Sequence, residues 1–255
     1  MTDLVTAAVL VIGNEILSGR TQDANVAFLG KNLNDLGIRL MEVRVVADIE
    51  DEIVDAVNTL RNRYDYLFTT GGIGPTHDDI TADSVARAFG VGIDYHPEVF
   101  ELLKQNFESR GMEANGARMR MARVPDGAEL IDNEISLAPG FQIENVFVLA
   151  GVPSIARAMF NGAKKRLRRG AVVMSRSIRC HCGEGTIADP LGSVQDAFPD
   201  VDIGSYPWSR DGKYGTSLVL RATDTALLDA AYDAVFQAAA DAGGDPVEEA
   251  SEAAG

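Results

Sequence analysis

Residue types suited to phosphate chemistry are concentrated in one stretch, residues 69–79, which reads TTGGIGPTHDD. Glycine-rich turns let backbone N–H groups approach an anion such as phosphate closely. The positive side chain that often assists such a turn is missing, and Asp78 and Asp79 stand in its place. Carboxylates repel phosphate unless a divalent cation lies between them, so we expect this turn to bind phosphate together with Mg²⁺ or another divalent cation.

Other groups in this stretch could contact the phosphate directly. Backbone amides at three glycines could donate to the anion, assisted by the N-terminus of the next helix; these are Gly71, Gly72 and Gly74. Hydroxyls at strand and helix ends could bond ligand oxygens or only their own backbone; these belong to Thr69, Thr70 and Thr81. His77, beside the aspartates, could also touch a phosphate.

Helix capping is the alternative role for the carboxylates. Asp78 and Asp79 stand directly before a predicted helix, and either could cap it instead of binding metal. Asp48 also precedes a predicted helix, and its place at the end of a strand favours a role in the site. We take Asp48, Asp78 and Asp79 as the candidate catalytic residues and leave capping open for each.

Several familiar catalytic motifs are missing from the sequence. The glycine turn has no G-K-[ST] ending, and the first predicted strand leads into GNEILSG rather than G-x-G-x-x-G. Neither a G-x-S-x-G elbow nor a Cys/His pair with signature spacing occurs, which disfavours covalent nucleophilic catalysis. Metal-assisted phosphoryl chemistry requires none of these motifs.

Apolar patterning predicts alternating strands and helices around the turn. Residues 7–13 (AAVLVIG) form a continuous apolar run closed by glycine, typical of a strand covered on both faces. A helix follows, with Asn25 as its expected N-cap and Gly37 at its end. Further strands are expected at 38–48 and 64–70, a hairpin at 135–151, and helices at 48–60, 79–90, 97–110 and 152–167. This alternation predicts a three-layer α/β fold whose mostly parallel sheet includes a β-hairpin.

The predicted fold brings separate loops together. Ligands of an open parallel sheet bind outside the carboxyl ends of its strands. Residues 13–25, Asp48 and residues 69–81 all follow predicted strands, so we expect three loops to converge on one crevice. The carboxyl groups of Asp48 and Asp79 should then face one cavity that the glycine turn also lines.

The pattern changes after Gly170 to a small α+β arrangement. We expect strands at 171–179, 201–208 and 215–223 and helices at 184–198 and 226–240. The chain is therefore divided into a phosphate-binding domain at 1–169, a small α+β subdomain at 170–241, and an acidic, mobile tail at 242–255.

Composition and charge limit the partners and the compartment. The chain has 255 residues and a formal net charge of −15, which disfavours nucleic acid and anionic membranes. A basic run at 164–170 closes a predicted helix, where the helix dipole favours cations. Residues 1–15 lack a basic leader and are apolar only over a strand's length, so we expect a cytoplasmic protein without a signal peptide or membrane span.

The two cysteines, Cys180 and Cys182, flank His181. A zinc site would need a fourth ligand, and no second Cys/His cluster supplies one. We therefore expect small buried thiols at a strand end.

These motifs resemble the molybdopterin-binding domain family, also called the molybdenum-cofactor biosynthesis domain, and within it the CinA (competence/damage-inducible) branch. TTGGIGPTHDDIT matches the family's central motif, and VIGNEILSGRTQDANVAFL is similar to the opening segment of that branch. VVAD at Asp48, APGF at 138–141 and LAGVPS at 149–154 also fit, so the resemblance covers residues 5–165. Residues 203–224 resemble the small domain that follows this module in CinA-like proteins and in some eukaryotic FAD synthetases.

The resemblance implies a site for a nucleotide or pterin phosphate with Mg²⁺, in which Asp48 and Asp79 act on the metal. The implied ligand-binding positions are Gly13, Glu15, Asn25, Thr69, Thr70, Gly71, Gly72, Gly74, Thr81, Gly151, Pro153 and Ser154. Two departures concern the substrate: the family's Pro-Gly-x-Pro loop begins with Ala150, and Arg118 stands where asparagine is common. We expect the sequence to end before the amidohydrolase domain of the CinA branch.

Three functions stay open. The CinA resemblance implies Mg²⁺-dependent hydrolysis of a nucleotide diphosphate linkage, as in ADP-ribose or FAD. A molybdopterin adenylyltransferase would use the same site, and so would a non-catalytic module that binds a nucleotide or pterin. We further expect a small-molecule ligand, no nucleic-acid or membrane partner, and a homo-oligomer.

Overall fold

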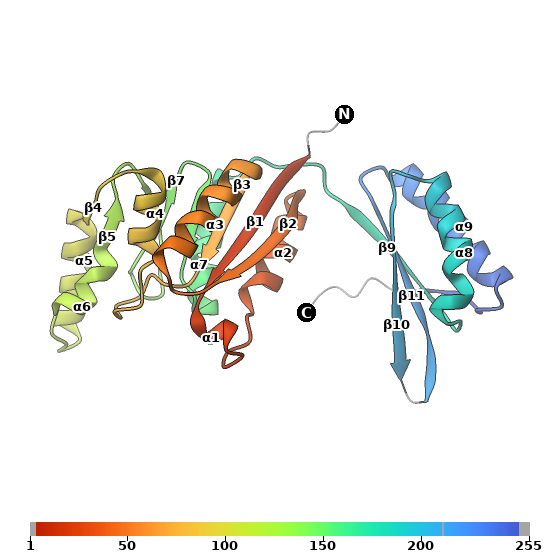
Figure 1. Cartoon of the computed structure of the whole chain (residues 1–255), viewed down its shortest axis with the longest axis horizontal. Helices are drawn as coiled ribbons and strands as arrows, with labels where there is room; N and C mark the ends of the chain where they lie inside the picture. Colours follow the sequence, from red (N-terminus) through yellow and green to blue (C-terminus); the bar gives the residue numbers. More distant parts are fainter. Residues whose placement is uncertain (1–3, 211, 250–255) are drawn as a thin grey trace. The chain divides into compact units, whose positions relative to one another are not determined.

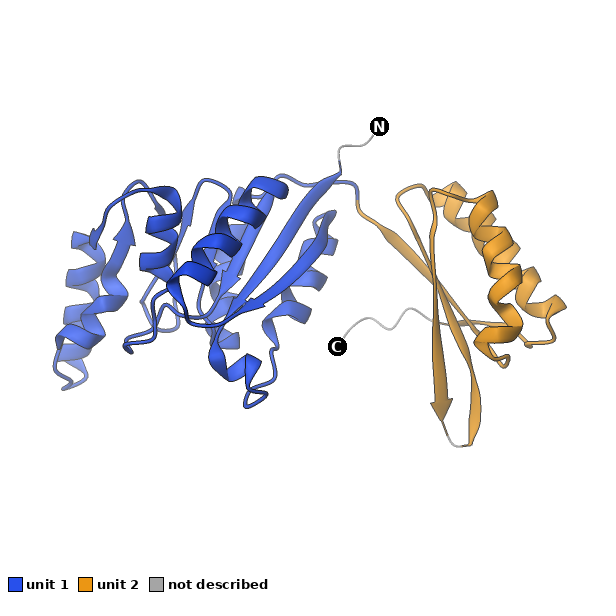
Figure 2. Ribbon diagram, in the orientation of Figure 1, with its two compact units in different colours: residues 1–171 blue, residues 172–255 orange. Residues whose placement is uncertain are grey.

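The chain divides into two compact units, residues 1–171 and residues 172–255 (Figure 2). The computed structural model describes residues 4–210 and 212–249. Each unit contains a sheet of its own and buries a separate hydrophobic core against it.

The first unit is built on a six-stranded sheet. Its strands are β1 (Val5–Ile12), β2 (Ile38–Val46), β3 (Tyr66–Thr70), β6 (Glu129–Ile131), β7 (Gly140–Ile143) and β8 (Val146–Leu149), in the spatial order β2-β1-β3-β8-β7-β6. The pairs β1–β2, β1–β3 and β3–β8 are parallel, whereas β7 runs antiparallel to both of its neighbours. The predicted hairpin is therefore β7–β8, and it returns the chain to a mostly parallel sheet.

Helices cover both faces of this sheet (Figure 1). They are α2 (Asn25–Asp35), α3 (Glu50–Arg63), α4 (Thr81–Phe89) and α7 (Pro153–Ala163). The stripes of α3 and α4 pack on one face through residues such as Leu60 and Val85, and those of α2 and α7 pack on the other through Leu29 and Phe160. The predicted three-layer α/β fold is confirmed.

The apolar run of β1 explains its central place. Leu10 and Ile12 point into the core beneath α3 and α4, while Val9 and Val11 point into the core beneath α2 and α7. Because successive side chains of a strand alternate between faces, a strand covered on both sides must be apolar throughout.

The strand order reverses at β1, which has β2 on one side and β3 on the other. The carboxyl ends of β1 and β3 lie next to each other, with Val11 in register with Thr70. Open α/β sheets bind ligands in the crevice beside such a reversal. The glycine turn after β3 and the loop after β1 therefore open at the same edge of the sheet.

Short elements were missed by the sequence patterns, because three or four residues do not establish a period. These are α1 (Asn14–Leu17), α6 (Gly116–Met119), the 3₁₀ turns η1 (Arg120–Ala122) and η2 (Lys164–Arg166), β6, and a two-stranded sheet of β4 (Ile93–Tyr95) and β5 (Arg123–Pro125). The predicted helix α5 (Pro97–Ser109) packs near α6 and η1 around Leu103 and Met119.

The predicted cap of α2 is wrong. Asn25 is the first residue of this helix, and its side chain makes no capping hydrogen bond. The carboxylate of Asp23 accepts instead from the Val26 N–H, at 2.8 Å. Asn25 is thereby free for the contact described below.

The second unit has an antiparallel sheet with two helices on one face (Figure 1). Its elements are β9 (Met174–Cys180), α8 (Glu184–Ala197), β10 (Asp202–Arg210), β11 (Lys213–Ala222), α9 (Thr225–Asp241) and β12 (Val247–Glu249), with the strand order β10-β11-β9-β12. Ile178, Leu218 and Leu220 pack against both helices. The expectation of a mobile tail from residue 242 is wrong for β12, which pairs with β9; residues 250–255 lie outside the described residues.

Cys180 and Cys182 are free, buried thiols whose Sγ atoms lie 3.2 Å apart. Among the helices within residues 4–210 and 212–249, none has the length and apolarity needed to cross a membrane.

Candidate functional site

The glycine turn fits tightly against the end of β1. Gly71 and Gly72 both have positive φ, 103° and 69°, a conformation that side chains disfavour. A Cβ at residue 71 would collide with the Ile12 carbonyl oxygen, and one at residue 72 would collide with the Thr81 hydroxyl. Both positions therefore require glycine for backbone geometry and for space.

Thr81 holds the turn in place. Its hydroxyl donates to the Gly71 carbonyl oxygen and its backbone N–H donates to the Gly72 carbonyl oxygen, both at 2.9 Å. Of the two roles that the sequence left open, the structure shows the backbone role. The Oγ1 atoms of Thr69 and Thr70, in contrast, are buried without a hydrogen-bond partner among the described residues.

Asp79 does not cap α4. Its Oδ2 accepts from the backbone N–H of Thr76 at 2.7 Å and from the Thr76 hydroxyl at 2.5 Å. The helix begins after Ile80, which makes no side-chain cap. Oδ1 of Asp79 accepts no hydrogen bond from the described residues, so one oxygen of this carboxylate is available to a ligand.

Asp78 and His77 lie on the outside of the turn. Their side chains are 58% and 97% exposed, with His77 Nδ1 3.9 Å from Asp78 Oδ1. The Thr76 hydroxyl, followed by the backbone N–H of Asp78, lowers the pKa of the Asp78 carboxyl, which favours its charged form. Neither residue caps α4.

Asp48 is bound to the loop after β1. Its Oδ2 accepts from the Asn14 backbone N–H at 2.8 Å, at the start of α1. The N-cap of α3 is Ile49, so the capping alternative is wrong for Asp48. Asp48 and the glycine turn lie at the same sheet edge, but Asp48 is not among the described residues that line the cleft below.

The glycine turn forms one wall of a cleft of about 530 Å³. Residues 71–74, Pro75 and Asp79 line this cleft, and so do residues 150–153 of the neighbouring loop after β8. Apolar side chains, including Met121, Ile155 and Met159, supply much of the remaining surface. A cleft of this volume can hold a small organic ligand.

A smaller pocket of about 60 Å³ adjoins the cleft and shares Glu15, Gly71, Gly151 and Pro153 with it. Asn25 lines this pocket, and its Nδ2 donates to the Gly151 carbonyl oxygen at 2.9 Å. Its Oδ1 is buried without a donor among the described residues. An unsatisfied buried acceptor is costly, so this oxygen favours a ligand donor or water.

The other predicted ligand-binding positions are placed as follows. Gly13 donates its N–H to the Val46 carbonyl oxygen, and a Cβ there would lie 2.6 Å from both Glu15 carboxylate oxygens. Gly151 approaches Gly71 so closely that its Cβ would lie 3.2 Å from the Gly71 Cα. Ser154 is exposed and lines neither the cleft nor the smaller pocket among the described residues.

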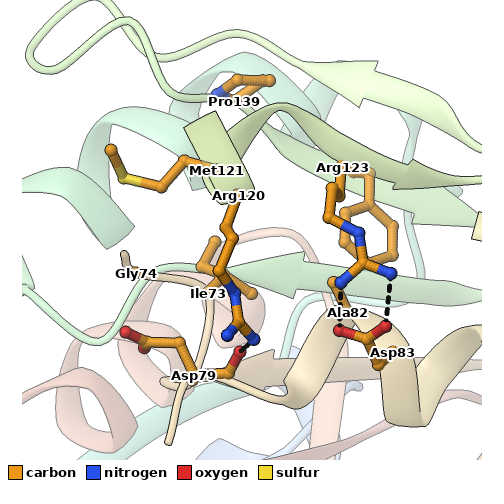
Figure 3. Close-up of a pocket in the computed structure, with 11 residues that line it drawn as sticks. Ile73, Gly74, Asp79, Ala82, Asp83, Arg120, Met121, Arg123 and Pro139 are labelled. Carbon is orange, nitrogen blue, oxygen red and sulfur yellow. Dashed lines mark hydrogen bonds and ion pairs between the residues drawn. The ribbon is translucent and has the colours of Figure 1, made fainter. Parts of the chain in front are cut away.

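A positive side chain does reach the turn, and sequence reasoning missed it. Arg120, from η1, donates from Nη2 to the Asp79 carbonyl oxygen at 3.2 Å (Figure 3). It lines a narrow pocket with Gly72, Gly74 and Asp79, beside the paired Arg123 and Asp83. The only available signal was three arginines within residues 118–123, about forty residues after the turn.

Comparison with known proteins places this site in a family. Residues 8–169 match the family model described as "Probable molybdopterin binding domain", and residues 172–243 match the model of the middle domain of FAD synthase. The first match covers more than half of the 255 residues. The chain belongs to the molybdopterin-binding domain family.

Similar proteins support this assignment. A protein of Aeropyrum pernix is 36% identical over 210 residues, which are 79% of this chain and 78% of the relative. A CinA-like protein of Chloroherpeton thalassium is 31% identical, over 76% of this chain and 49% of the relative, so the chain spans about half of that protein. The crystal structure of the protein CinA, of unknown function, from Thermoplasma acidophilum matches with 31% identity and a TM-score of 0.59, covering 64% of this chain and 98% of that chain.

The molybdopterin-binding domain offers Mg²⁺ an incomplete set of ligands. Within the described residues no group of three or more His, Cys, Asp and Glu side chains could hold a metal ion. Asp79 has one available carboxylate oxygen in the cleft, and Mg²⁺ is commonly held by one or two carboxylates plus substrate phosphates and water. These residues therefore fit a Mg²⁺ ion that is bound together with a phosphate ligand.

The departures from the motif of the molybdopterin-binding domain affect different places. Arg118 donates to the Glu113 carbonyl oxygen at 2.6 Å and lies over the Phe107 ring, outside the cleft lining. Ala150, in contrast, lines the cleft, and its N–H donates to the Met159 sulfur at 3.3 Å. Of the two, only Ala150 is placed to affect which ligand the cleft accepts.

Proposed function

We propose that the first unit is a Mg²⁺-dependent enzyme that binds a nucleotide with a diphosphate linkage and hydrolyses that linkage. The observation that carries this proposal is the shared cleft, which Asp79 and residues 71–74 line together. A preformed turn with glycine amides can bind phosphate, and the adjacent carboxylate can hold the counter-ion that phosphate requires.

The residues of the chain would bind and orient the diphosphate. The amides of Gly72 and Gly74 would donate to phosphate oxygens, assisted by the N-terminus of α4, whereas the Gly71 N–H already donates to the Leu149 carbonyl oxygen at 3.3 Å. Arg120, which bonds the Asp79 carbonyl oxygen, would keep the segment before α4 in position. The apolar wall with Met121, Ile155 and Met159 would exclude water from one side of the ligand.

Asp79 would hold Mg²⁺ through Oδ1, with Asp78 assisting and Asp48 contributing from the loop after β2. When bound, the cation supplies polarisation of phosphate oxygens and lowers the pKa of a bound water. Asp48 already accepts from Asn14, so its contribution requires its second carboxylate oxygen. The identity of the cation, Mg²⁺ or another divalent ion, is part of this proposal.

A molybdopterin adenylyltransferase is the second candidate. The family match names molybdopterin, and the apolar surface of the cleft suits a flat, fused-ring ligand. A third candidate is a binding module without catalysis. All three use the same glycine turn.

An activity panel separates these candidates. The full chain is incubated with Mg²⁺ and ADP-ribose, FAD or NAD, and then with molybdopterin plus ATP, and products are resolved by liquid chromatography. Hydrolysis of a member of the first group without an acceptor supports the proposal. Consumption of ATP only with the pterin supports adenylyl transfer, and tight binding without turnover supports the binding module.

The remaining expectations concern partners and location. We propose a small nucleotide or pterin phosphate as the ligand, with neither nucleic acid nor membrane as a partner, in keeping with the net charge of −15. The cytoplasmic location and the homo-oligomer also stay proposals. Size-exclusion chromatography with light scattering tests the oligomer, and a monomer at all concentrations would contradict it.

A further inference from the structure

The sheet of the second unit has one face that its helices leave uncovered. In β11 the even-numbered residues, such as Leu218 and Leu220, are buried beneath α8 and α9. Odd-numbered residues, such as Ser217 and Arg221, point to the opposite face and are partly exposed. The alternation therefore makes this second face polar.

A cavity of about 470 Å³ lies on this polar face. Four strands supply its lining, which includes Ser177, Arg179, Trp208, Arg210, Ser217 and Glu249. The register supports this grouping, because Ser217 pairs with Arg179, Trp208 with Gly215 and Glu249 with Ser177. The volume is within the range of sites for small organic ligands.

A carboxylate of the chain already occupies part of this cavity. Glu249, from β12, forms an ion pair with Arg179 and accepts from the Ser217 hydroxyl at 2.6 Å. The Ser217 hydroxyl, followed by Arg179 and Arg210, lowers the pKa of the Glu249 carboxyl. The cavity is therefore chemically suited to hold an anion. The anion that it holds in this structure is the Glu249 carboxylate, which belongs to β12, a strand of only three residues.

The polar groups that remain in the cavity are mainly donors. Within the described residues, Arg210 acts on Glu249 through its charge but forms no ion pair or hydrogen bond through its side chain. Its planar guanidinium offers several N–H donors, a geometry that suits phosphate and carboxylate oxygens. The Ser177 hydroxyl likewise has no partner among the described residues. A ligand that satisfies these groups must present several acceptor oxygens.

Trp208 adds an aromatic surface to the charged groups. Its indole lies over Gly215, where a Cβ would approach ring atoms of Trp208 to 2.8 Å. The Arg179 guanidinium carbon lies 5.6 Å from the indole centroid, and the His181 ring meets the indole edge-on at 5.2 Å. An aromatic ring beside arginine side chains suits a ligand that combines a flat ring with an anionic group.

We propose that this cavity binds a free nucleotide, with its phosphate on Arg179 and Arg210 and its base against Trp208. The phosphate competes with the Glu249 carboxylate for Arg179, so β12 limits the affinity of the site. A single nucleotide fits a cavity of this size, and the net charge of −15 opposes a nucleic-acid polymer. All of the residues that line this cavity belong to the second unit.

Intrinsic fluorescence tests the proposal, because Trp208 is the only tryptophan of the 255 residues. The full chain is titrated with AMP, adenosine, inorganic phosphate and a short single-stranded oligonucleotide while the Trp208 emission is recorded. We expect the Trp208 emission to change with AMP concentration until the site is saturated. Phosphate should compete weakly with AMP. Adenosine should leave the emission unchanged at the concentration at which AMP saturates the site.

Variants identify the residues involved. Arg210→Met should weaken AMP binding about tenfold or more, as expected for the loss of a charge-assisted contact. Glu249→Gln should strengthen it, because the competing charge is removed. The matched control is Arg221→Met, which changes an arginine on the same face of the same sheet. Arg221 forms an ion pair with Asp202 at 3.7 Å and does not line the cavity.

The outcomes decide the proposal. Equal AMP affinity for Arg210→Met and Arg221→Met, in variants with unchanged circular dichroism, would overturn it. Tighter binding of the oligonucleotide than of AMP would overturn the choice of a free nucleotide. Because Arg210 lies in the second unit and lines its cavity, the comparison of Arg210→Met with Arg221→Met does not depend on hydrolysis in the first unit.

Discussion

The Asp79 carboxylate packs directly on Gly74, so that a Cβ at residue 74 would lie 2.6 Å from Asp79 Oδ2. The same oxygen accepts both hydrogen bonds from Thr76, which fixes the carboxylate in one orientation. Position 74 thus requires glycine because a side chain would collide with the Asp79 carboxylate. The local backbone does not require glycine, because its φ is not positive.

Gly74→Ala should therefore displace the Asp79 carboxylate without unfolding the first unit. We expect Mg²⁺-dependent nucleotide binding to weaken about tenfold, while stability changes by no more than about 1 kcal/mol, since the added methyl meets a side chain near the surface. Isothermal titration with ADP-ribose and Mg²⁺, together with urea unfolding, measures both. Gly116→Ala, where a Cβ meets nothing within 4 Å, is the control.

Arg120→Met should loosen the segment before α4, because it removes the hydrogen bond to the Asp79 carbonyl oxygen. We expect a KM several-fold higher and a smaller change in kcat, since Arg120 acts on the position of Asp79 rather than on the reacting atoms. Steady-state kinetics with the substrate found in the panel provides the measurement. A fall in kcat with an unchanged KM would contradict the positioning role.

Asp48→Asn tests whether Asp48 does more than hold Asn14. Asparagine keeps an oxygen that can accept from the Asn14 N–H, so the melting temperature should change little. If Asp48 also contributes charge to Mg²⁺, the metal concentration that gives half-maximal activity should rise about tenfold. An unchanged metal requirement would leave Asp48 with a structural role only.

Cys182 should resist thiol reagents in the folded protein. Burial, and next the neighbouring Cys180 thiol, raise the pKa of Cys182 from 9.0 to about 11. The thiolate is the reactive form, so alkylation by iodoacetamide at pH 8 should be far slower in the folded protein than in urea, as mass spectrometry can follow.

The raised pKa of Cys182 also makes stability depend on pH. Between pH 9 and 11 the folded state keeps the Cys182 thiol proton and the unfolded state has lost it, so the unfolding free energy should fall as pH rises through that window. Cys182→Ala should show a shallower fall.

The sequence was sufficient for the parts of the fold that depend on long apolar patterns. The run at β1 and the stripes of α2, α3 and α4 predicted the layered sheet, and the chain order of strands and helices predicted that the loops after β1 and β3 open at one edge. The glycine turn was recognisable because positive φ at Gly71 and Gly72 leaves few alternatives to glycine.

What the sequence could not predict are contacts between residues far apart in the chain. Arg120 reaches Asp79 across forty-one positions, and Asn25 reaches the Gly151 carbonyl across 126. Local rules made Asn25 and Asp48 look like helix caps, whereas tertiary partners, Gly151 and Asn14, bind their side chains. β12 was missed because three acidic or apolar residues carry no strand pattern of their own.

Asp79→Asn is the decisive substitution for the proposed function. The structure excludes capping as the role of Asp79, but the two hydrogen bonds from Thr76 give it a structural role in the turn. Asparagine can keep both bonds through its remaining oxygen, so the melting temperature without ligand should be nearly unchanged.

Removing the charge of Asp79 has a different effect on Mg²⁺. If the asparagine oxygen keeps the bonds from Thr76, the amide NH₂ takes the place of Oδ1, and an NH₂ group cannot bind the cation. The hold of Mg²⁺ on both phosphate and water depends on that ligand. We expect loss of the Mg²⁺-dependent thermal stabilisation by nucleotide and a turnover that is lower by about a hundredfold or more. Differential scanning fluorimetry and product analysis measure the two effects on the same sample. Full metal-dependent turnover by Asp79→Asn would show that Asp79 serves only to bind Thr76 within the turn. The proposed hydrolytic mechanism would then be wrong.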